Sequence, residues 1–203
     1  ILYCVATGFG KKAVSCANAE SPEIVCLSRA LRALDPDVRT VVDAGGHSIR
    51  VISIGDNGRI LDSAVNEKCA SGTGKFVQVM ANALELPLST VSELSSEATD
   101  PVSITSQCGV FAESEVITHV NDGRSADDIV AGIARSVASK IASLARRVEL
   151  REKVAMVGGV ALNKGVVGYV EEELQVKLTD LDIDPQIASA LGAALLAREK
   201  ATR

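Results

Sequence analysis

Three consecutive strand-like segments constrain the fold of this chain more than any other feature. Residues 38–44 run into Gly45-Gly46, residues 49–54 follow, and Asp56-Asn57-Gly58 separates them from residues 59–65. Asn-Gly between two alternating segments is a strong hairpin signal, because both residues accept the positive φ that a tight turn needs. We therefore expect a mainly antiparallel unit of three strands in the first third of the chain.

After residue 65, helical periodicity of the apolar residues replaces alternation. We expect helices over residues 22–34, 72–86, 91–96, 109–120, 125–147, a helix ending near 174, and 185–199, with short strands over residues 2–6, 154–157 and 176–178. Ser125 followed by Asp128 resembles a helix cap. An antiparallel unit that leads into helices and then a parallel strand is typical of an α/β fold.

The composition argues against several classes of protein. A net charge of −5, without a clustered basic stripe, argues against nucleic acid as the main partner. No apolar run reaches about 18 residues, so we expect no membrane span and no membrane partner. Five cysteines without close pairing favour the reducing cytoplasm. The chain begins without methionine, inside an apparent strand and without a secretory signal, so we expect a fragment or a processed chain.

Two glycine pairs follow strand-like segments and are candidates for phosphate binding. Asp43 with Gly45-Gly46 brings a carboxylate and backbone N–H groups to one point, which suits nucleotide phosphates and Mg²⁺. Gly158-Gly159 forms a second turn, where the missing Cβ lets a ligand lie against the backbone. For both pairs the alternative is an ordinary turn that serves packing. His47 stands where a phosphate or an attacking water would lie.

Two of the five cysteines, Cys69 and Cys108, each precede a predicted helix. Helix N-termini carry partial positive charge and free N–H groups, which suit thiolates, and Gly72-x-Gly74 gives the first of them a flexible backbone. Two such thiolates can form half of a metal-cluster site, and the alternative is that both are small buried hydrophobes. The chain has no Cys-x-x-Cys, so we expect no zinc site within one chain. We assign the remaining cysteines to packing: Cys4, Cys16 and Cys26.

The predicted helix after Cys108 carries Glu113 and Glu115. Either can bond ribose hydroxyls, and the alternative is a solvated glutamate on an exposed helix face. Residues 71–75 match a Walker-type phosphate loop only incompletely, because the glycine spacing is wrong. We therefore do not expect a P-loop fold.

Several collinear motifs give the chain a resemblance to a known family. They are residues 5–10, 23–26, 43–46, 66–76, 108–117, 158–163 and 190–194. In order and extent they resemble the activator ATPases of 2-hydroxyacyl-CoA dehydratases. These belong to the BadF/BadG/BcrA/BcrD ATPase family, together with the ATP-hydrolysing subunits of benzoyl-CoA reductase. The resemblance covers essentially the whole length of the chain.

The resemblance implies an actin/sugar-kinase/Hsp70-like ATPase fold, in which two ribonuclease-H-like lobes hold ATP between them. Residues 1–65 then form the remainder of the N-terminal lobe and the start of the second lobe. Residues 66–203 form the helix-rich second lobe, whose closing helix packs back on the first. The family's first phosphate loop has no counterpart here, so we expect a first lobe that is incomplete by about 60 residues.

The resemblance also implies ATP or ADP with Mg²⁺, a homodimer, and one [4Fe–4S] cluster shared between two subunits. Cys69 and Cys108 of each chain match the cluster ligands, and Asp43 and His47 match catalytic positions. The helices behind the two cysteines would aim their N-termini at the cluster. The residues implied in nucleotide binding are Gly45, Gly46, Gly72, Thr73, Gly74, Glu113, Gly158, Gly159 and Asn163.

The implied activity is ATP-dependent transfer of one electron to a 2-hydroxyacyl-CoA dehydratase or a related low-potential enzyme, with a ferredoxin or flavodoxin as upstream donor. Three alternatives stay open: an ATP-binding subunit of a benzoyl-CoA reductase-type or other metalloenzyme-activation complex, a non-hydrolysing interaction subunit, and a small-molecule kinase of the same fold. Three positions depart from the family pattern. His47 replaces glutamine, Ser48 replaces aspartate, and Leu162 stands where arginine is frequent.

Overall fold

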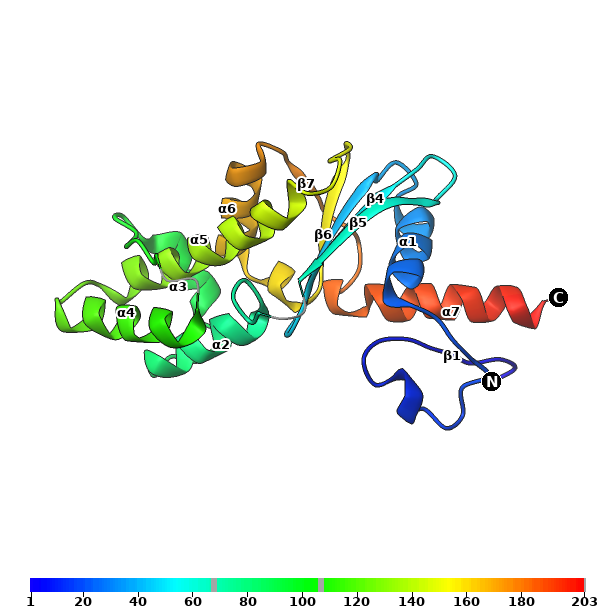
Figure 1. Ribbon diagram of the computed structural model, residues 1–203, viewed down its shortest axis with the longest axis horizontal. Helices are drawn as coiled ribbons and strands as arrows, with labels where there is room; N and C mark the ends of the chain where they lie inside the picture. Colours follow the sequence, from blue (N-terminus) through cyan, green and yellow to red (C-terminus); the bar gives the residue numbers. More distant parts are fainter. Residues whose placement is uncertain (67–68, 106–107, 203) are drawn as a thin grey trace.

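A five-stranded sheet lies at the centre of the protein, in a computed structural model that describes residues 1–66, 69–105 and 108–202 (Figure 1). Its strand order is β5-β4-β3-β6-β7, and β1 and β2 form a separate parallel pair. The strands are β1 (Val5–Ala6), β2 (Ala19–Glu20), β3 (Thr40–Ala44), β4 (Ile49–Ile54), β5 (Ile60–Asn66), β6 (Val154–Val157) and β7 (Leu178–Thr179).

The antiparallel unit predicted from the sequence is confirmed. β3 pairs with β4 and β4 pairs with β5, both antiparallel, and Gly58 adopts a φ of 76° in the hairpin between β4 and β5. β6 then pairs parallel to β3, with Asp43 opposite Val157. Parallel neighbours end at the same edge of a sheet, so the two glycine turns leave this edge side by side.

Helices cover both faces of the sheet (Figure 1). The α-helices are α1 (Glu23–Leu34), α2 (Gly74–Ala83), α3 (Val91–Glu97), α4 (Gly109–Asn121), α5 (Ala126–Ala145), α6 (Lys164–Leu174) and α7 (Ala188–Ala201). Short 3₁₀ turns span Lys11–Ala13, Gly159–Leu162 and Pro185–Ile187. Ser125 caps α5 as predicted, because its side chain accepts a hydrogen bond from the Asp128 N–H.

Alternation along β3 divides the core between two sets of helices. Val41 packs in a cluster with Leu27 and Leu31 of α1, whereas the next residue, Val42, belongs to the larger cluster built by α2 to α6. Successive strand side chains point to opposite faces, so one strand serves both clusters. In Figure 1, α1 and α7 lie together at one end of the molecule, and α2 to α5 lie at the other.

Several boundaries differ from the predicted ones for local reasons. The first helix after the antiparallel unit begins at Gly74 instead of residue 72, because Gly72 has a φ of 87° that no α-helix contains. The same helix ends at Ala83, two residues before Glu85 with its φ of 55°. The closing helix starts as the 3₁₀ turn Pro185–Ile187 before α7.

The cysteines assigned to packing have different environments. Cys26 is fully buried in α1, as predicted, and Cys4 is half-buried. Cys16 is exposed, in the loop before β2, so the packing prediction is wrong for it. In the part of the chain that the structure describes, no helix combines the length and the apolarity needed to cross a lipid bilayer.

Candidate functional site

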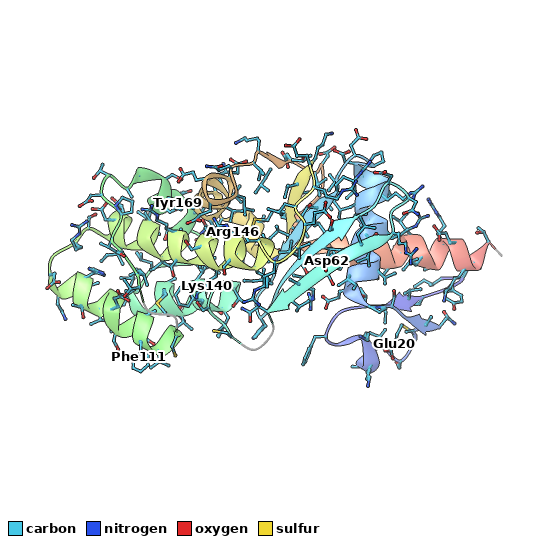
Figure 2. All side chains as sticks on the ribbon, turned by 45° about the horizontal axis from the view of Figure 1, so that its top comes forward. Glu20, Asp62, Phe111, Lys140, Arg146 and Tyr169 are labelled. Carbon is cyan, nitrogen blue, oxygen red and sulfur yellow. The ribbon has the colours of Figure 1, made fainter. Side chains whose placement is uncertain are left out.

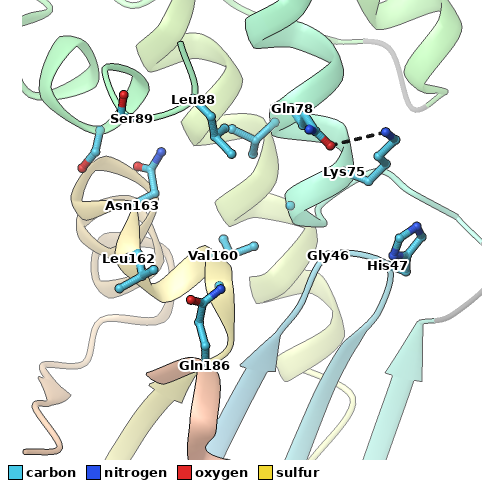
Figure 3. Close-up of a pocket in the computed structure, with 14 residues that line it drawn as sticks. Gly46, His47, Lys75, Gln78, Leu88, Ser89, Val160, Leu162, Asn163 and Gln186 are labelled. Carbon is cyan, nitrogen blue, oxygen red and sulfur yellow. Dashed lines mark hydrogen bonds between the residues drawn. The ribbon is translucent and has the colours of Figure 1, made fainter. Parts of the chain in front are cut away.

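Two cavities open where the glycine turns meet. One has a volume of about 510 Å³ and the other about 770 Å³, and both are lined by Gly46, His47, Gly159 and Gln186. Figure 3 shows the smaller cavity between the end of the sheet, α2 and the 3₁₀ turn that contains Val160. The structure therefore brings both predicted turns and His47 to one place.

The second turn needs glycine for packing as well as for ligand approach. Gly158 has φ 87° and ψ 168°, a region that is essentially restricted to glycine. A Cβ at this position would lie 2.7 Å from the carbonyl carbon of Ala44 and 2.9 Å from Oδ1 of Asp43. The Gly158 N–H donates to the Pro185 carbonyl at 2.9 Å, which fixes the turn against the start of the closing segment.

The first turn is tied to the start of α2. The carbonyl oxygens of Gly45 and Gly46 accept hydrogen bonds of 2.9 Å each from the N–H groups of Gly74 and Lys75. Gly74 also packs closely on Gly46, because a Cβ on Gly74 would lie 3.4 Å from the Gly46 Cα. The first N–H groups of α2 therefore donate to the first glycine turn. The family resemblance implies that they face a cluster, and this pairing prevents it.

Asp43 is a buried acidic group in the wall of the larger cavity, and it is neutralised by a contact within the chain. It lies at the end of β3, is 8% exposed, and accepts a hydrogen bond from Nη1 of Arg50 at 3.0 Å. Nη2 of Arg50 lies 2.8 Å from Oε2 of Glu23, the first residue of α1. Burial raises the pKa of Asp43 above its ordinary value, while the charge and hydrogen bond of Arg50 counteract the rise.

The prediction from sequence missed Arg50. The signal was present in the register, because Arg50 on β4 pairs directly with Asp43 on β3 in an antiparallel ladder. Opposite charges on directly opposed residues attract each other across such a ladder.

The donor set at this edge fits a magnesium ion bound together with a nucleotide. Mg²⁺ is usually held by one or two carboxylates plus phosphate oxygens and water. Asp43 supplies one carboxylate, with Oδ2 toward Arg50 and Oδ1 close to Gly158.

The smaller cavity has the mixed lining of a nucleoside site. Leu88, Val160 and Leu162 form an apolar part, and the polar groups around it include Gln78, Ser89, Ser92 and Asn163. Figure 3 shows side chains from α2, the segment before α3 and the 3₁₀ turn arranged around this space. Apolar walls with a few polar groups are typical of sites for small organic ligands.

Three of the residues implied in nucleotide binding do not line either cavity. Gly72 has a packing role, because a Cβ there would lie 2.7 Å from the Cβ of Lys140 and 2.9 Å from Cδ1 of Ile49. Thr73 is fully buried and its hydroxyl donates to the Ala70 carbonyl at 2.6 Å, which closes the turn before α2. Glu113 is half-buried on α4, which packs against α2.

Cys69 and Cys108 are both exposed. Cys108 is the N-cap residue of α4, as predicted, whereas Cys69 lies five residues before α2. Val110 and Phe111, which are 70% and 69% exposed, add apolar surface beside Cys108, and Phe111 lies on the outer side of α4 in Figure 2. The motif residues Glu67, Lys68, Ser106 and Gln107 lie outside the described residues.

The two thiols amount to half of the ligands that a [4Fe–4S] cluster requires. Within residues 1–66, 69–105 and 108–202, no three His, Cys, Asp or Glu side chains form a group that could hold a metal ion. Cys69 and Cys108 alone therefore fall two ligands short of such a cluster, and both thiols are exposed.

Comparisons with known proteins place this geometry in context. A family model described as "BadF/BadG/BcrA/BcrD ATPase family" matches residues 1–197. The chain is 42% identical to the 2-hydroxyisocaproyl-CoA dehydratase activator of Clostridioides difficile, over 97% of this chain and 74% of that protein. It is 44% identical to the activator of lactoyl-CoA dehydratase of Anaerotignum propionicum, over 100% of this chain and 78% of that protein.

A solved structure gives the same result in three dimensions. The activator of the 2-hydroxyisocaproyl-CoA dehydratase from Clostridium difficile, with bound ADPNP, superimposes with a TM-score of 0.96 at 41% identity. The match covers 100% of this chain and 75% of that one.

Proposed function

The chain belongs to the BadF/BadG/BcrA/BcrD ATPase family and has its actin/sugar-kinase/Hsp70-like ATPase fold, and we propose that it is an ATP-dependent activator. In this role it donates one electron to a 2-hydroxyacyl-CoA dehydratase or a related low-potential enzyme. The observation that carries the proposal is the meeting of two glycine turns and Asp43 beside two cavities. The relatives named as dehydratase activators support the choice of partner.

The two adjoining cavities divide the nucleotide between them in this proposal. The adenosine lies in the smaller cavity against Val160, Leu162 and Asn163, and the phosphates lie against Gly45-Gly46 and Gly158-Gly159. Asp43 is the residue that would hold Mg²⁺. When bound, the ion would neutralise part of the phosphate charge. His47, in the wall of both cavities, orients the attacking water.

The exposed cysteines are the second element of the proposal. Cys69 and Cys108 would hold a [4Fe–4S] cluster together with the same two residues of a second chain, so the active form is a homodimer. The cluster would store the electron before its transfer to the partner enzyme. A ferredoxin or flavodoxin would donate this electron. The exposure of Val110 and Phe111 beside Cys108 supports contact with another protein surface here.

Hydrogen bonds offer a route between the two parts. The carbonyl groups of Gly45 and Gly46 hold the first N–H groups of α2, and the loop that starts at Cys69 leads into this helix. A shift of the first turn on nucleotide binding or hydrolysis would therefore move the start of α2. In this proposal that movement changes the position of Cys69 and so couples ATP to electron transfer.

An anaerobic electron-transfer assay tests the proposal. The chemically reduced protein is mixed with a 2-hydroxyacyl-CoA dehydratase and its substrate, and dehydration is measured with and without ATP. We expect dehydration only with ATP, and a loss of at least about tenfold in Asp43→Asn, because second-sphere and ligand changes at metal sites commonly have effects of this size. Asp56→Asn, in an exposed hairpin, should match the parent. Dehydration that is equally fast without ATP would contradict the proposal.

A further inference from the structure

Three charged residues from three different elements meet in the wall of the larger cavity. Asp43 ends β3, Arg50 lies opposite it on β4, and Glu23 begins α1. The guanidinium nitrogens of Arg50 lie 3.0 Å from Oδ2 of Asp43 and 2.8 Å from Oε2 of Glu23. The side chains of Arg50 and Asp43 are only 13% and 11% exposed, so this contact is largely removed from water.

We propose that Arg50 is a positioning residue that orients Asp43 for Mg²⁺–nucleotide binding. The proposal rests on the nucleotide site proposed above. The contact with Arg50 holds Oδ2 on the β4 side, and Oδ1 remains close to Gly158, at the turn assigned to the phosphates. Arg50 thereby fixes which oxygen of the carboxylate faces the metal.

Glu23 fixes the other end of the guanidinium group. Arginine is a planar fork that can bond two carboxylates at once, whereas lysine is a single point charge on a flexible stem. Glu23 on α1 and Asp43 on β3 therefore hold the Arg50 guanidinium from two sides. A rotation of this side chain toward the cavity would break at least one of the two contacts. Pre-oriented second-sphere contacts of this kind change metal affinity by about 10- to 100-fold.

An ion pair beyond the opposite ends of β3 and β4 provides a matched comparison. Nε of Arg39, just before β3, lies 2.9 Å from Oδ1 of Asp56 in the hairpin after β4. Asp56 has a side chain that is 80% exposed, and neither residue lines the two cavities. Arg39→Gln therefore removes an arginine–aspartate pair from the same sheet without touching the proposed site.

The test measures binding of a fluorescent ADP analogue to the purified protein, in excess Mg²⁺ and in excess EDTA. For the parent and for Arg39→Gln we expect Mg²⁺ to strengthen binding. For Arg50→Gln we expect the Mg²⁺-dependent gain to fall by at least about tenfold while the affinity in EDTA stays unchanged. Arg50→Lys should show an intermediate gain, because it keeps the charge but cannot hold both carboxylates.

The outcomes separate this inference from the function on which it rests. A folded Arg50→Gln protein with the parent's full Mg²⁺-dependent gain overturns the role of Arg50 and leaves the nucleotide site standing. If Arg50→Gln does not fold, the same measurement is made on Arg50→Lys. A folded Arg50→Lys protein whose affinity rises with Mg²⁺ as much as the parent's also overturns the role of Arg50. A parent protein that binds no nucleotide in either buffer overturns both the site and the inference.

Discussion

At the carboxyl edge of the sheet, two glycine turns from residues more than one hundred positions apart are complete within one chain, whereas Cys69 and Cys108 provide only two exposed thiols. Strand register determines the first site: Asp43 pairs with Val157, and both turns follow directly. The second site depends on the ends of two loops. Strand pairing within one chain therefore fixes the two glycine turns, whereas the exposed loops leave the two thiols accessible to a second chain.

The contacts around the two regions differ accordingly. Gly158 approaches the backbone of Ala44 so closely that no side chain fits there, and Gly45 and Gly46 are hydrogen-bonded to α2. By contrast, the Cys69 carbonyl accepts a 3.3 Å hydrogen bond from the Asn66 side chain. Substitution of Gly158 should therefore affect folding, and substitutions at the cysteines should affect metal content alone.

The largest effect is expected from Gly158→Ala. The backbone conformation is restricted to glycine and the new Cβ would press on Ala44 and Asp43, so the free energy of unfolding should fall by about 2–5 kcal/mol. Urea denaturation followed by circular dichroism measures this loss. Gly46→Ala is the matched control, because a Cβ there meets no atom within 4 Å. A control that loses as much stability as Gly158→Ala would remove the contrast between the two turns.

A smaller loss of stability is expected when acid protonates Asp128, whose carboxylate holds the segment around Thr99 and Asp100 that leads toward Cys108. Oδ1 of Asp128 accepts hydrogen bonds from the N–H groups of Thr99 and Asp100 at 3.1 and 2.8 Å. The Asp100 N–H is the main reason why the pKa of Asp128 lies below its ordinary value, with Arg124 contributing attraction. A lowered pKa means that this contribution to stability is present above the ordinary pKa and is lost as the pH falls through the lowered one.

Asp128→Asn tests this contribution. Thermal unfolding of the parent between pH 7 and pH 3 should show a decrease at the acid end that is smaller in the variant, since the amide keeps an acceptor oxygen but cannot be protonated in this range. Asp127→Asn, one residue earlier in α5, is the control. Identical pH profiles for the parent and Asp128→Asn would show that this carboxylate does not hold the segment.

Replacement of the cysteines by serine should change stability by no more than about 0.5 kcal/mol, because both side chains are exposed. Nucleotide affinity should also remain unchanged, since neither residue lines a cavity. Urea denaturation and ADP titration of the metal-free Cys69→Ser and Cys108→Ser proteins check this expectation. A clear loss of nucleotide affinity in either variant would show that the two regions are not separable.

Leu162, in the wall of the smaller cavity, is expected to have a small effect on nucleotide affinity. Leu162→Arg should strengthen ADP binding by about two- to fivefold, because a guanidinium plane that stacks on an aromatic base contributes about 0.5–1 kcal/mol. Leu61→Arg is a suitable control, since Leu61 is equally exposed on β5 and lines neither cavity. Equal affinities of Leu162→Arg and the parent would place the base elsewhere.

The sequence allowed prediction of the features that depend on local pattern. The Asn57-Gly58 hairpin, the cap at Ser125 and the strand before Gly158 all follow from short-range chemistry. The meeting of the two turns required only one further step, the parallel pairing of β6 with β3.

Features that depend on contacts between distant residues could not be predicted in this way. The packing of Gly72 against Lys140 and the use of the first α2 N–H groups by Gly45 and Gly46 involve elements that local spacing does not relate. The pairing of Arg50 with Asp43 became visible only once the register of β3 and β4 was known.

Iron content per dimer tests most directly the claim that one chain holds both glycine turns of the nucleotide site but only half of a cluster site. The protein is purified without oxygen, its mass is measured by light scattering, and its iron is assayed on the same sample. We expect a brown dimer with about four irons, the content of one cubane cluster, and a Cys69→Ser/Cys108→Ser protein without iron. The matched variant Cys16→Ser, at another exposed cysteine, should keep all four. A colourless protein that binds ADP, or iron that survives loss of both Cys69 and Cys108, would contradict the account.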